Sequence, residues 1–192
     1  MTELRAGFAL CGSFCTFDKV MPEICRLKAA GIDLTPIMSE KAFETDTRFG
    51  SAAEWADKIA EICEKPVIHT IQQAEPIGPN RLLDILIVAP CTGNTIGKLA
   101  AGITDTCVTM ACKAHLRGGK PIVLAPSTND GLSGAAKNIG ELLARKNVYF
   151  VPFRQDDPKN KPFSIASDMK LIAQTVEYAL RGEQLQPILL AD

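Results

Sequence analysis

The chain has 192 residues, of which 46% are apolar, and its 21 lysines and arginines nearly balance its 22 aspartates and glutamates. A chain of this length buries enough surface to form a single domain around one core. Because no excess of one charge covers the surface, neither nucleic acid nor an anionic membrane is indicated as a partner. We therefore expect a small-molecule ligand.

The seven cysteines are an odd number, and most lie within apolar runs, where a free thiol behaves as a small hydrophobic group. This usage is typical of the reducing cytosol, so we expect a cytoplasmic protein. The first eleven residues carry Glu3 and Arg5 and are followed by no small-residue cleavage site. Charged residues interrupt every apolar run before the roughly 18 residues that a membrane span requires. Neither a signal peptide nor a transmembrane segment is predicted.

Five unbroken apolar runs bounded by Gly, Pro or Ser are typical of strands covered on both faces of a parallel sheet. They lie at 4–11, 34–38, 85–89, 122–125 and 148–151. Segments of helical character separate them, at 22–30, 52–63, 94–101, 105–116, 132–145 and 168–180. The alternation predicts an α/β fold, a three-layer doubly wound parallel sheet of the Rossmann or flavodoxin type, in a single domain over residues 1–192.

Local signals set several element boundaries. Ser51, with Glu54 three residues later, has the pattern of a capping box, and Gly31 has the position of a glycine that ends a helix. Pro22 would break a helix begun at Thr16, so we expect the first main helix to begin at Pro22 after a long loop at 12–21. The polar, proline-bearing segments 72–79 and 154–162 are predicted loops.

Ligands of an open parallel sheet bind beyond the carboxyl ends of the strands, so the residues after each apolar run are site candidates. After the first run, Gly12 permits close backbone approach, and Ser13 and Thr16 offer hydroxyls, which resembles a phosphate loop. Taken alone, a Gly-Ser pair is more often a simple turn. Neither G-x-G-x-x-G nor the P-loop pattern is present. Ser39, after the second run, is another neutral donor, whereas Glu40 is interpreted as a surface charge.

The densest group of candidates follows the third run, where Thr92, Gly93, Asn94 and Thr95 lead into a helix. The free N–H groups at a helix N-terminus attract anions and carbonyl oxygens. A flavin fits the whole segment, because its phosphate and ring carbonyls need several neutral donors. The alternative for Thr92 or Asn94 taken singly is an ordinary N-cap. Cys91 would need an adjacent histidine to act as a nucleophile, and no motif fixes one.

The fourth run ends in a similar way, with Ala-Pro followed by Ser127, Thr128 and Asn129, which predicts one pocket shared by neighbouring strand ends. His69 closes a short apolar run and is the candidate catalytic histidine. His115 lies late in a helix, where it is expected to interact with the helix C-terminus. No metal site is predicted, because the close cysteine pairs lack C-x₂-C spacing or a nearby histidine.

These strand-end motifs resemble those of the homo-oligomeric flavin-containing cysteine decarboxylase superfamily. Residues 89–95 (APCTGNT) are similar to its P-[AL]-S-A-N-T motif, residues 125–132 to P-x-M-N-x-x-M, and residues 98–105 to K-[IL]-A-x-G-[IL]-x-D. The resemblance implies a closed homo-oligomer that binds FMN. It also implies the site residues: Asn129 and His69 for catalysis and, for the cofactor, Gly12, Ser13, Ser39, Thr92, Gly93, Asn94, Thr95, Ser127 and Thr128.

Longer segments, 69–79, 127–132 and 146–158, resemble one branch of the superfamily, and the likeness extends from Gly7 to Leu190. Members of that branch work with a nicotinamide-binding A subunit to form a pyridine dicarboxylate from a tetrahydrodipicolinate-type precursor. The resemblance therefore implies that the partner is an A subunit and that the substrate is a small dicarboxylate. Lys98, Lys113 and Arg117 are candidate donors to its carboxylates.

Two departures from the decarboxylases argue against decarboxylation of peptidyl cysteine. Thr128 replaces their motif methionine, and His69 aligns with their histidine only across the inserted segment 72–79. Three alternatives stay open at this point: a flavin-dependent decarboxylase, an enzyme like the flavin prenyltransferases, and a non-catalytic stabilising subunit.

Overall fold

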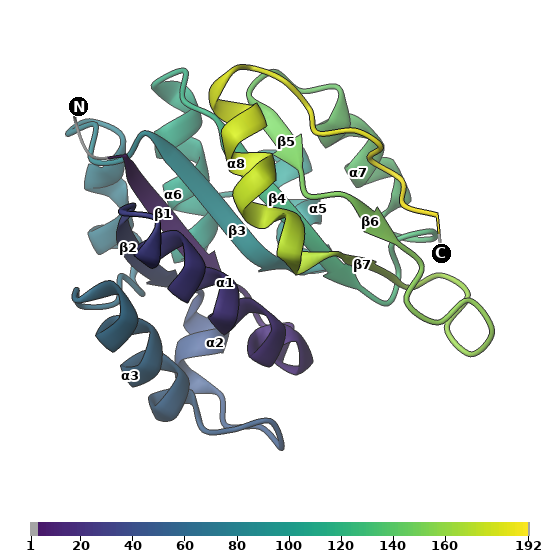
Figure 1. Cartoon of the computed structure of the whole chain (residues 1–192), viewed down its shortest axis with the longest axis horizontal. Helices are drawn as coiled ribbons and strands as arrows, with labels where there is room; N and C mark the ends of the chain where they lie inside the picture. Colours follow the sequence, from purple (N-terminus) through teal and green to yellow (C-terminus); the bar gives the residue numbers. More distant parts are fainter. Residues whose placement is uncertain (1–3, 192) are drawn as a thin grey trace.

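A mostly parallel sheet forms the centre of the computed structural model, which describes residues 4–191 (Figure 1). Its strand order is β2-β1-β3-β4-β7-β6, with β5 also paired to β4. The pairs among β1 to β5 are parallel, whereas β7 pairs antiparallel with β4 and with β6. The strands are β1 (Arg5–Leu10), β2 (Asp33–Met38), β3 (Ile85–Cys91), β4 (Ile122–Thr128), β5 (Val148–Phe150), β6 (Phe153–Arg154) and β7 (Ile165–Ser167).

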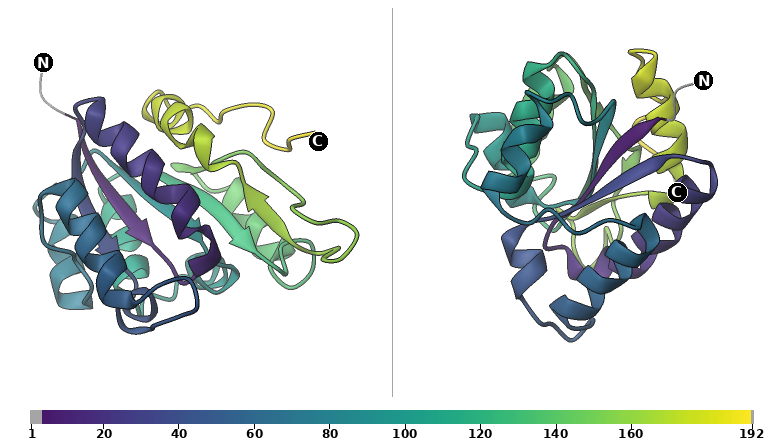
Figure 2. Two further views of the ribbon diagram at one scale, coloured as in Figure 1. Left: turned by 60° about the horizontal axis from the view of Figure 1, so that its bottom comes forward. Right: turned by 90° about the vertical axis from the view of Figure 1, so that its left-hand side faces the viewer.

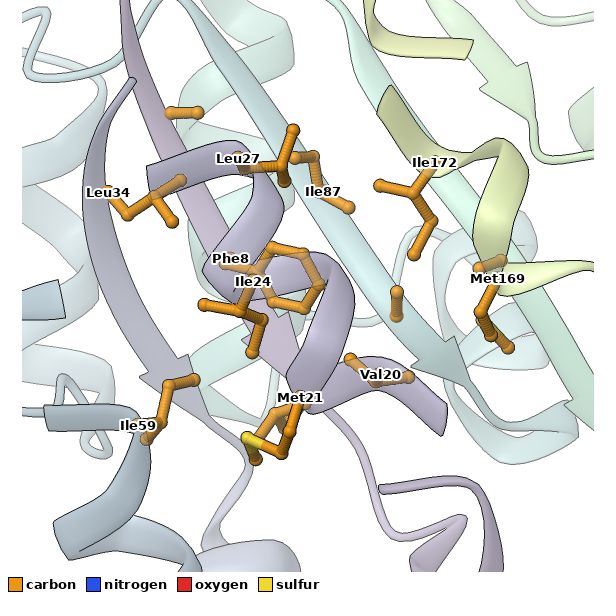
Figure 3. Packing of buried hydrophobic residues seen from close by; sticks show 14 of the residues in the cluster. Phe8, Val20, Met21, Ile24, Leu27, Leu34, Ile59, Ile87, Met169 and Ile172 are labelled. Atoms are coloured by element: carbon orange, nitrogen blue, oxygen red, sulfur yellow. The ribbon is translucent and has the colours of Figure 1, made fainter. Parts of the chain in front are cut away.

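Helices cover both faces of this sheet, as the alternating pattern predicts (Figure 2). One face packs against α1, α3 and α8, and Figure 3 shows Ile24 and Leu27 of α1 against Phe8 and Ile87 of the sheet. The other packs against α5, α6 and α7. The α-helices are α1 (Phe17–Ala29), α2 (Glu40–Glu44), α3 (Ala52–Cys63), α4 (Ile71–Ala74), α5 (Gly93–Ala101), α6 (Cys107–Arg117), α7 (Ala136–Leu143) and α8 (Ile172–Leu180). The 3₁₀ helices are η1 (Phe14–Thr16), η2 (Glu75–Ile77) and η3 (Met169–Leu171).

The prediction that Pro22 begins the first helix is wrong. Helix α1 begins at Phe17 and continues through Pro22. An interior proline costs a helix about 3 kcal/mol, since it removes one backbone donor and crowds the preceding turn. Phe17, Val20 and Ile24 are each fully buried on the face that meets the sheet. Burying such side chains contributes about 1.5–3 kcal/mol each, so their packing outweighs the proline.

Other element boundaries follow capping signals. The predicted capping box of Ser51 and Glu54 is confirmed and begins α3, and Gly31 has a positive φ of 82° after α1. The prediction of a loop over 72–79 is wrong, because a second capping box, made by Thr70 and Gln73, starts α4, which η2 follows. The antiparallel strands β6 and β7 were not predicted, because two or three residues carry too little pattern.

His115 does not have the predicted role at the end of its helix. Its side chain is buried, and Nε2 lies 3.1 Å from the carbonyl oxygen of Pro121, to which the neutral ring donates. Burial lowers the pKa of His115 from its ordinary 6.5 to about 4, because the charged imidazolium loses its hydration. The folded protein therefore holds His115 in its neutral form near neutral pH.

We predict that this histidine makes folding stability depend on pH between about 6.5 and 4. In that interval the unfolded chain binds a proton at His115 that the folded chain does not, so stability falls as the pH falls. A His115→Gln variant keeps a donor to Pro121 and does not titrate. Urea unfolding at several pH values should show a smaller loss for the variant than for the parent. Equal losses would contradict this assignment.

Candidate functional site

Three hydroxyl groups meet beyond β1 and at the end of β4, at the carboxyl edge of the sheet. Ser13 Oγ lies 2.9 Å from Ser127 Oγ and 3.2 Å from Thr16 Oγ1. The distance between Thr16 Oγ1 and Ser127 Oγ is 2.9 Å. We call these three residues the hydroxyl cluster. Each hydroxyl can rotate to donate to an incoming oxygen atom, so the cluster suits a phosphate group.

Helix α5 begins beside this edge, and Thr92 is its N-cap. Thr92 Oγ1 accepts from the backbone N–H of Thr95 at 3.2 Å. The buried hydroxyl of Thr95 lies 3.1 Å from that of Thr92 and donates to the sulfur of Cys11 at 3.3 Å, which joins the helix to the loop after β1. Asn94 is exposed in the first turn. The capping alternative therefore holds for Thr92 and not for Asn94, whose amide remains available to a ligand.

Gly93 allows the ends of β3 and β4 to approach closely. A Cβ atom at this position would lie 2.6 Å from both Thr128 Oγ1 and Asp130 Oδ1, closer than real side chains come. Gly12 differs, because a Cβ there would meet only the ring of Phe14, at 3.5 Å. A side chain at position 93 would therefore require Thr128 and Asp130 to shift, whereas Gly12 leaves its backbone open toward the carboxyl edge.

Asp130 is a neighbour of the site that the sequence reasoning did not single out. Its carboxylate accepts a hydrogen bond from Thr128 Oγ1 and lies against Gly93, at the N-terminus of α5. Negative charge is favourable there because of the helix dipole. The Thr-x-Asp spacing after the fourth apolar run was the available signal, since such residues bond to each other in turns.

Asn129 and Ser39 lie at the same edge, each already engaged by the protein. Asn129 is exposed, and its Oδ1 accepts from Ser164 Oγ at 3.4 Å. Ser39 caps α2, with its Oγ accepting from Ala42 N at 3.3 Å. The Ser39 backbone N–H donates to Leu10 O at 2.9 Å, which holds the residue beside the end of β1. The Ser39 hydroxyl proton is still free to reach a ligand.

His69 lies at the opposite end of this row of strands. It follows Ile68, which pairs with Ile37 of β2, and its ring stacks on Phe43 with centroids 3.8 Å apart. Four strand spacings separate it from Asn129, because β2, β1 and β3 lie in between; this amounts to about 19 Å. One protomer therefore does not bring the two candidate catalytic residues together.

Other predicted polar residues have different surroundings. Glu40 is not simply a solvated surface charge, because its Oε1 accepts from the N–H of Cys107 at 2.7 Å and satisfies the start of α6. Lys98 is paired with Asp105 at 2.8 Å. Lys113 and Arg117 line a cavity that also includes the first residue of β4, away from the carboxyl edge. They are therefore unsuited to bind a substrate beside the hydroxyl cluster.

The buried cysteines beneath the site are not activated thiols. Burial raises the pKa of Cys11 to about 11 and that of Cys107 to about 12, and it raises the pKa of Cys91 well above its ordinary value. Such thiols stay protonated near neutral pH and are poor nucleophiles. Within residues 4–191 no three His, Cys, Asp or Glu side chains are grouped to hold a metal ion.

The mostly parallel sheet with helices on both faces defines an α/β protein of the flavodoxin-like type. Residues 1–173 match the sequence profile of the flavoprotein family, so the chain belongs to that family. Across the part of the chain that the structure describes, no helix is long and apolar enough to cross a membrane.

Within the family, the chain is similar to the B subunit of dipicolinate synthase. It is 45% identical to that protein of Bacillus subtilis over 186 residues, which cover 97% of this chain and 93% of the relative. The crystal structure of the corresponding protein from Bacillus halodurans superposes with a TM-score of 0.90 at 44% identity over the whole of both chains. The FMN-dependent cysteine decarboxylase SpaF shares the fold, with a TM-score of 0.66 at 20% identity over 93% of this chain and 95% of SpaF.

We predict that Thr92 and Asn94 differ in their contribution to stability. Thr92→Ala removes an N-cap and should lower the free energy of unfolding by about 1 kcal/mol. Asn94→Ala should change it by less than about 0.5 kcal/mol, because this exposed side chain holds no turn together. Urea unfolding of the two variants beside the parent measures both values. A larger loss of unfolding free energy for Asn94→Ala than for Thr92→Ala would show that Asn94 caps the helix.

Proposed function

We propose that this chain is the FMN-binding subunit of a cytoplasmic dipicolinate synthase. With the A subunit of dipicolinate synthase, which binds a nicotinamide, it forms pyridine-2,6-dicarboxylate from a tetrahydrodipicolinate-type precursor. The observation that carries the proposal is the convergence of the hydroxyl cluster and the start of α5 at one edge of the sheet. The similarity to the B subunit of dipicolinate synthase over nearly the whole chain supports it.

The donors at this edge fit FMN. The hydroxyl cluster, with Ser39 and the open backbone at Gly12, supplies neutral donors for a phosphate next to a helix start, where N–H groups also favour an anion. The rest of the cofactor would be held by residues at the start of α5 and the end of β4, namely Thr92, Asn94 and Thr128. When bound, FMN supplies an acceptor for hydride or electrons, which the aromatisation of a partly reduced ring requires.

The chain's own residues bind and orient the substrate in this proposal. Asn129 is exposed and held by Ser164, so its amide NH₂ group can donate to a substrate carboxylate. Asp130 keeps Thr128 in place against Gly93 and so fixes the edge that the substrate meets. The A subunit supplies the nicotinamide, for which this chain has no glycine fingerprint.

A closed homo-oligomer is part of the proposal. His69 and Asn129 are about 19 Å apart within one protomer, by four strand spacings. If both residues act on one substrate, they come from two copies of the chain.

We predict that Asn94 contributes to FMN affinity. Asn94→Ala removes one hydrogen bond to the cofactor, so the dissociation constant for FMN should rise about tenfold. Titration of deflavinated protein, followed by flavin fluorescence, measures it. Asn80→Ala is the matched control, because Asn80 is also exposed but precedes β3. FAD should bind more weakly than FMN to the parent. Equal affinities for FMN and FAD, or equal effects of the two substitutions, would contradict the site.

We also predict that dipicolinate forms only when both proteins are present. The A subunit, the purified flavin-loaded chain and their mixture are each given the precursor with an excess of oxidised nicotinamide as the hydride acceptor, and the product is measured by chromatography. The mixture should be active and each protein inactive on its own, and Asn129→Ala should lower the rate of the mixture without loss of flavin. An equal rate for the chain with and without its partner would refute shared catalysis. An unchanged rate with deflavinated chain would show that the chain only stabilises its partner.

A further inference from the structure

A cavity of about 470 Å³ lies among α5, α6 and α7, the helices on the face of the sheet opposite α1 and α8. Its lining includes Ile122, the first residue of β4, whereas Thr128, at the candidate flavin edge, is the last. Six residue steps along a strand correspond to about 20 Å. The cavity is therefore separate from the hydroxyl cluster, and nothing in the proposed synthase reaction uses it.

The walls of the cavity are apolar. Leu99 of α5, Leu116 of α6 and Leu142 of α7 line it, with Ile103 in the loop after α5. Ile103 is 47% exposed, so part of the apolar wall faces solvent. The volume lies within the range of sites for small organic molecules, which are concave and mainly apolar with a few polar groups.

The charges that line the cavity have one sign. Its residues include Lys113, Arg117 and Arg145 and no carboxylate. The Arg145 guanidinium is occupied, since it donates to Leu99 O at 2.9 Å and Ala100 O at 3.0 Å and pairs with Glu141. Lys113 and Arg117 form no ion pair with any residue between 4 and 191. They lie one helical turn apart, so both can reach one anion.

Cations in the last turn of a helix commonly bind its terminal carbonyl groups. In α6, two of these carbonyl groups already have backbone partners. The last carbonyl groups of the helix accept from the backbone, His115 O from Gly118 N at 3.0 Å and Leu116 O from Gly119 N at 2.9 Å. Within the described residues, Lys113 and Arg117 are left without a partner of opposite charge beside an apolar hollow. A bare inorganic anion would lose its hydration against those walls, so the apolar surface favours an organic anion.

We propose that this cavity binds a small organic carboxylate with an apolar ring or branched chain. The carboxylate accepts from Lys113 and Arg117 at the rim, and the apolar part packs among Leu99, Leu116 and Leu142. Both ends of such a molecule are needed, because an exposed ion pair alone contributes little and the apolar walls alone do not select charge.

Benzoate is the probe, and benzamide and acetate are its matched controls, the first without charge and the second without a ring. Each is titrated into the ¹⁵N-labelled full chain, and the amide shifts of 99–104 and 113–117 are followed. Benzoate should saturate these shifts, with an affinity at least about tenfold higher than that of either control. Non-saturating or equal shifts for the three compounds would overturn the proposal.

Variants locate the site. Lys113→Ala and Arg117→Ala should each weaken benzoate about three- to fivefold, as expected for an exposed cation. Thr104→Trp, in a loop that lines the cavity, should abolish binding by filling it. Lys137→Ala removes an exposed cation of α7 that does not line the cavity and should change nothing. Equal effects of Lys113→Ala and Lys137→Ala would overturn the proposal.

Folding and assembly are checked on the same samples. Circular dichroism establishes whether each variant is folded. If Thr104→Trp does not fold, the comparison of Lys113→Ala with Lys137→Ala still tests the proposal. Light scattering tests the alternative that a second copy of the chain covers this apolar face. If the parent binds no benzoate and Thr104→Trp or Ile103→Asp lowers the mass of the assembly, the cavity is an interface between copies and the proposal is wrong.

Discussion

Burial of both faces of the parallel sheet is the constraint on which the rest of this structure depends. Strands β1, β3 and β4 are covered by helices on either side, and their central residues are completely excluded from water. A polar side chain there would need a partner that a fully packed sheet does not offer. In these three strands, polar side chains are therefore confined to the strand ends, and the carboxyl ends meet at a single edge.

At that edge the polar groups bind mainly to one another. The hydroxyl cluster joins the loop after β1 to the end of β4, and the contact between Thr95 and Cys11 joins α5 to the same loop. Hydroxyl partners are individually weak, at about 1 kcal/mol each, and they can exchange one partner for another without leaving an ion buried. Such an edge is ordered without a ligand and still able to donate to one.

Much of this arrangement could be predicted from sequence because its signals are local. The start of α3 follows from the pattern of Ser51 and Glu54, and the polar residues after the Ala-Pro pairs mark the carboxyl edge of the sheet. The predicted ends of the third and fourth strands are wrong, because β3 continues to Cys91 and β4 to Thr128, and Cys91 pairs with Pro126. What could not be predicted depends on distant contacts. The burial of Phe17 and Ile24 decides the course of α1 through Pro22. Strand order separates His69 from Asn129, and no local pattern encodes strand order.

The contact of Gly93 with Thr128 and Asp130 links two parts of the chain that are 35 or more residues apart. Because any side chain at position 93 would displace the Thr128 and Asp130 oxygens, a change at position 93 requires those two side chains to change or to move. These three positions are therefore expected to vary together. Among natural relatives, a departure from glycine at position 93 should be accompanied by compensating changes at positions 128 and 130.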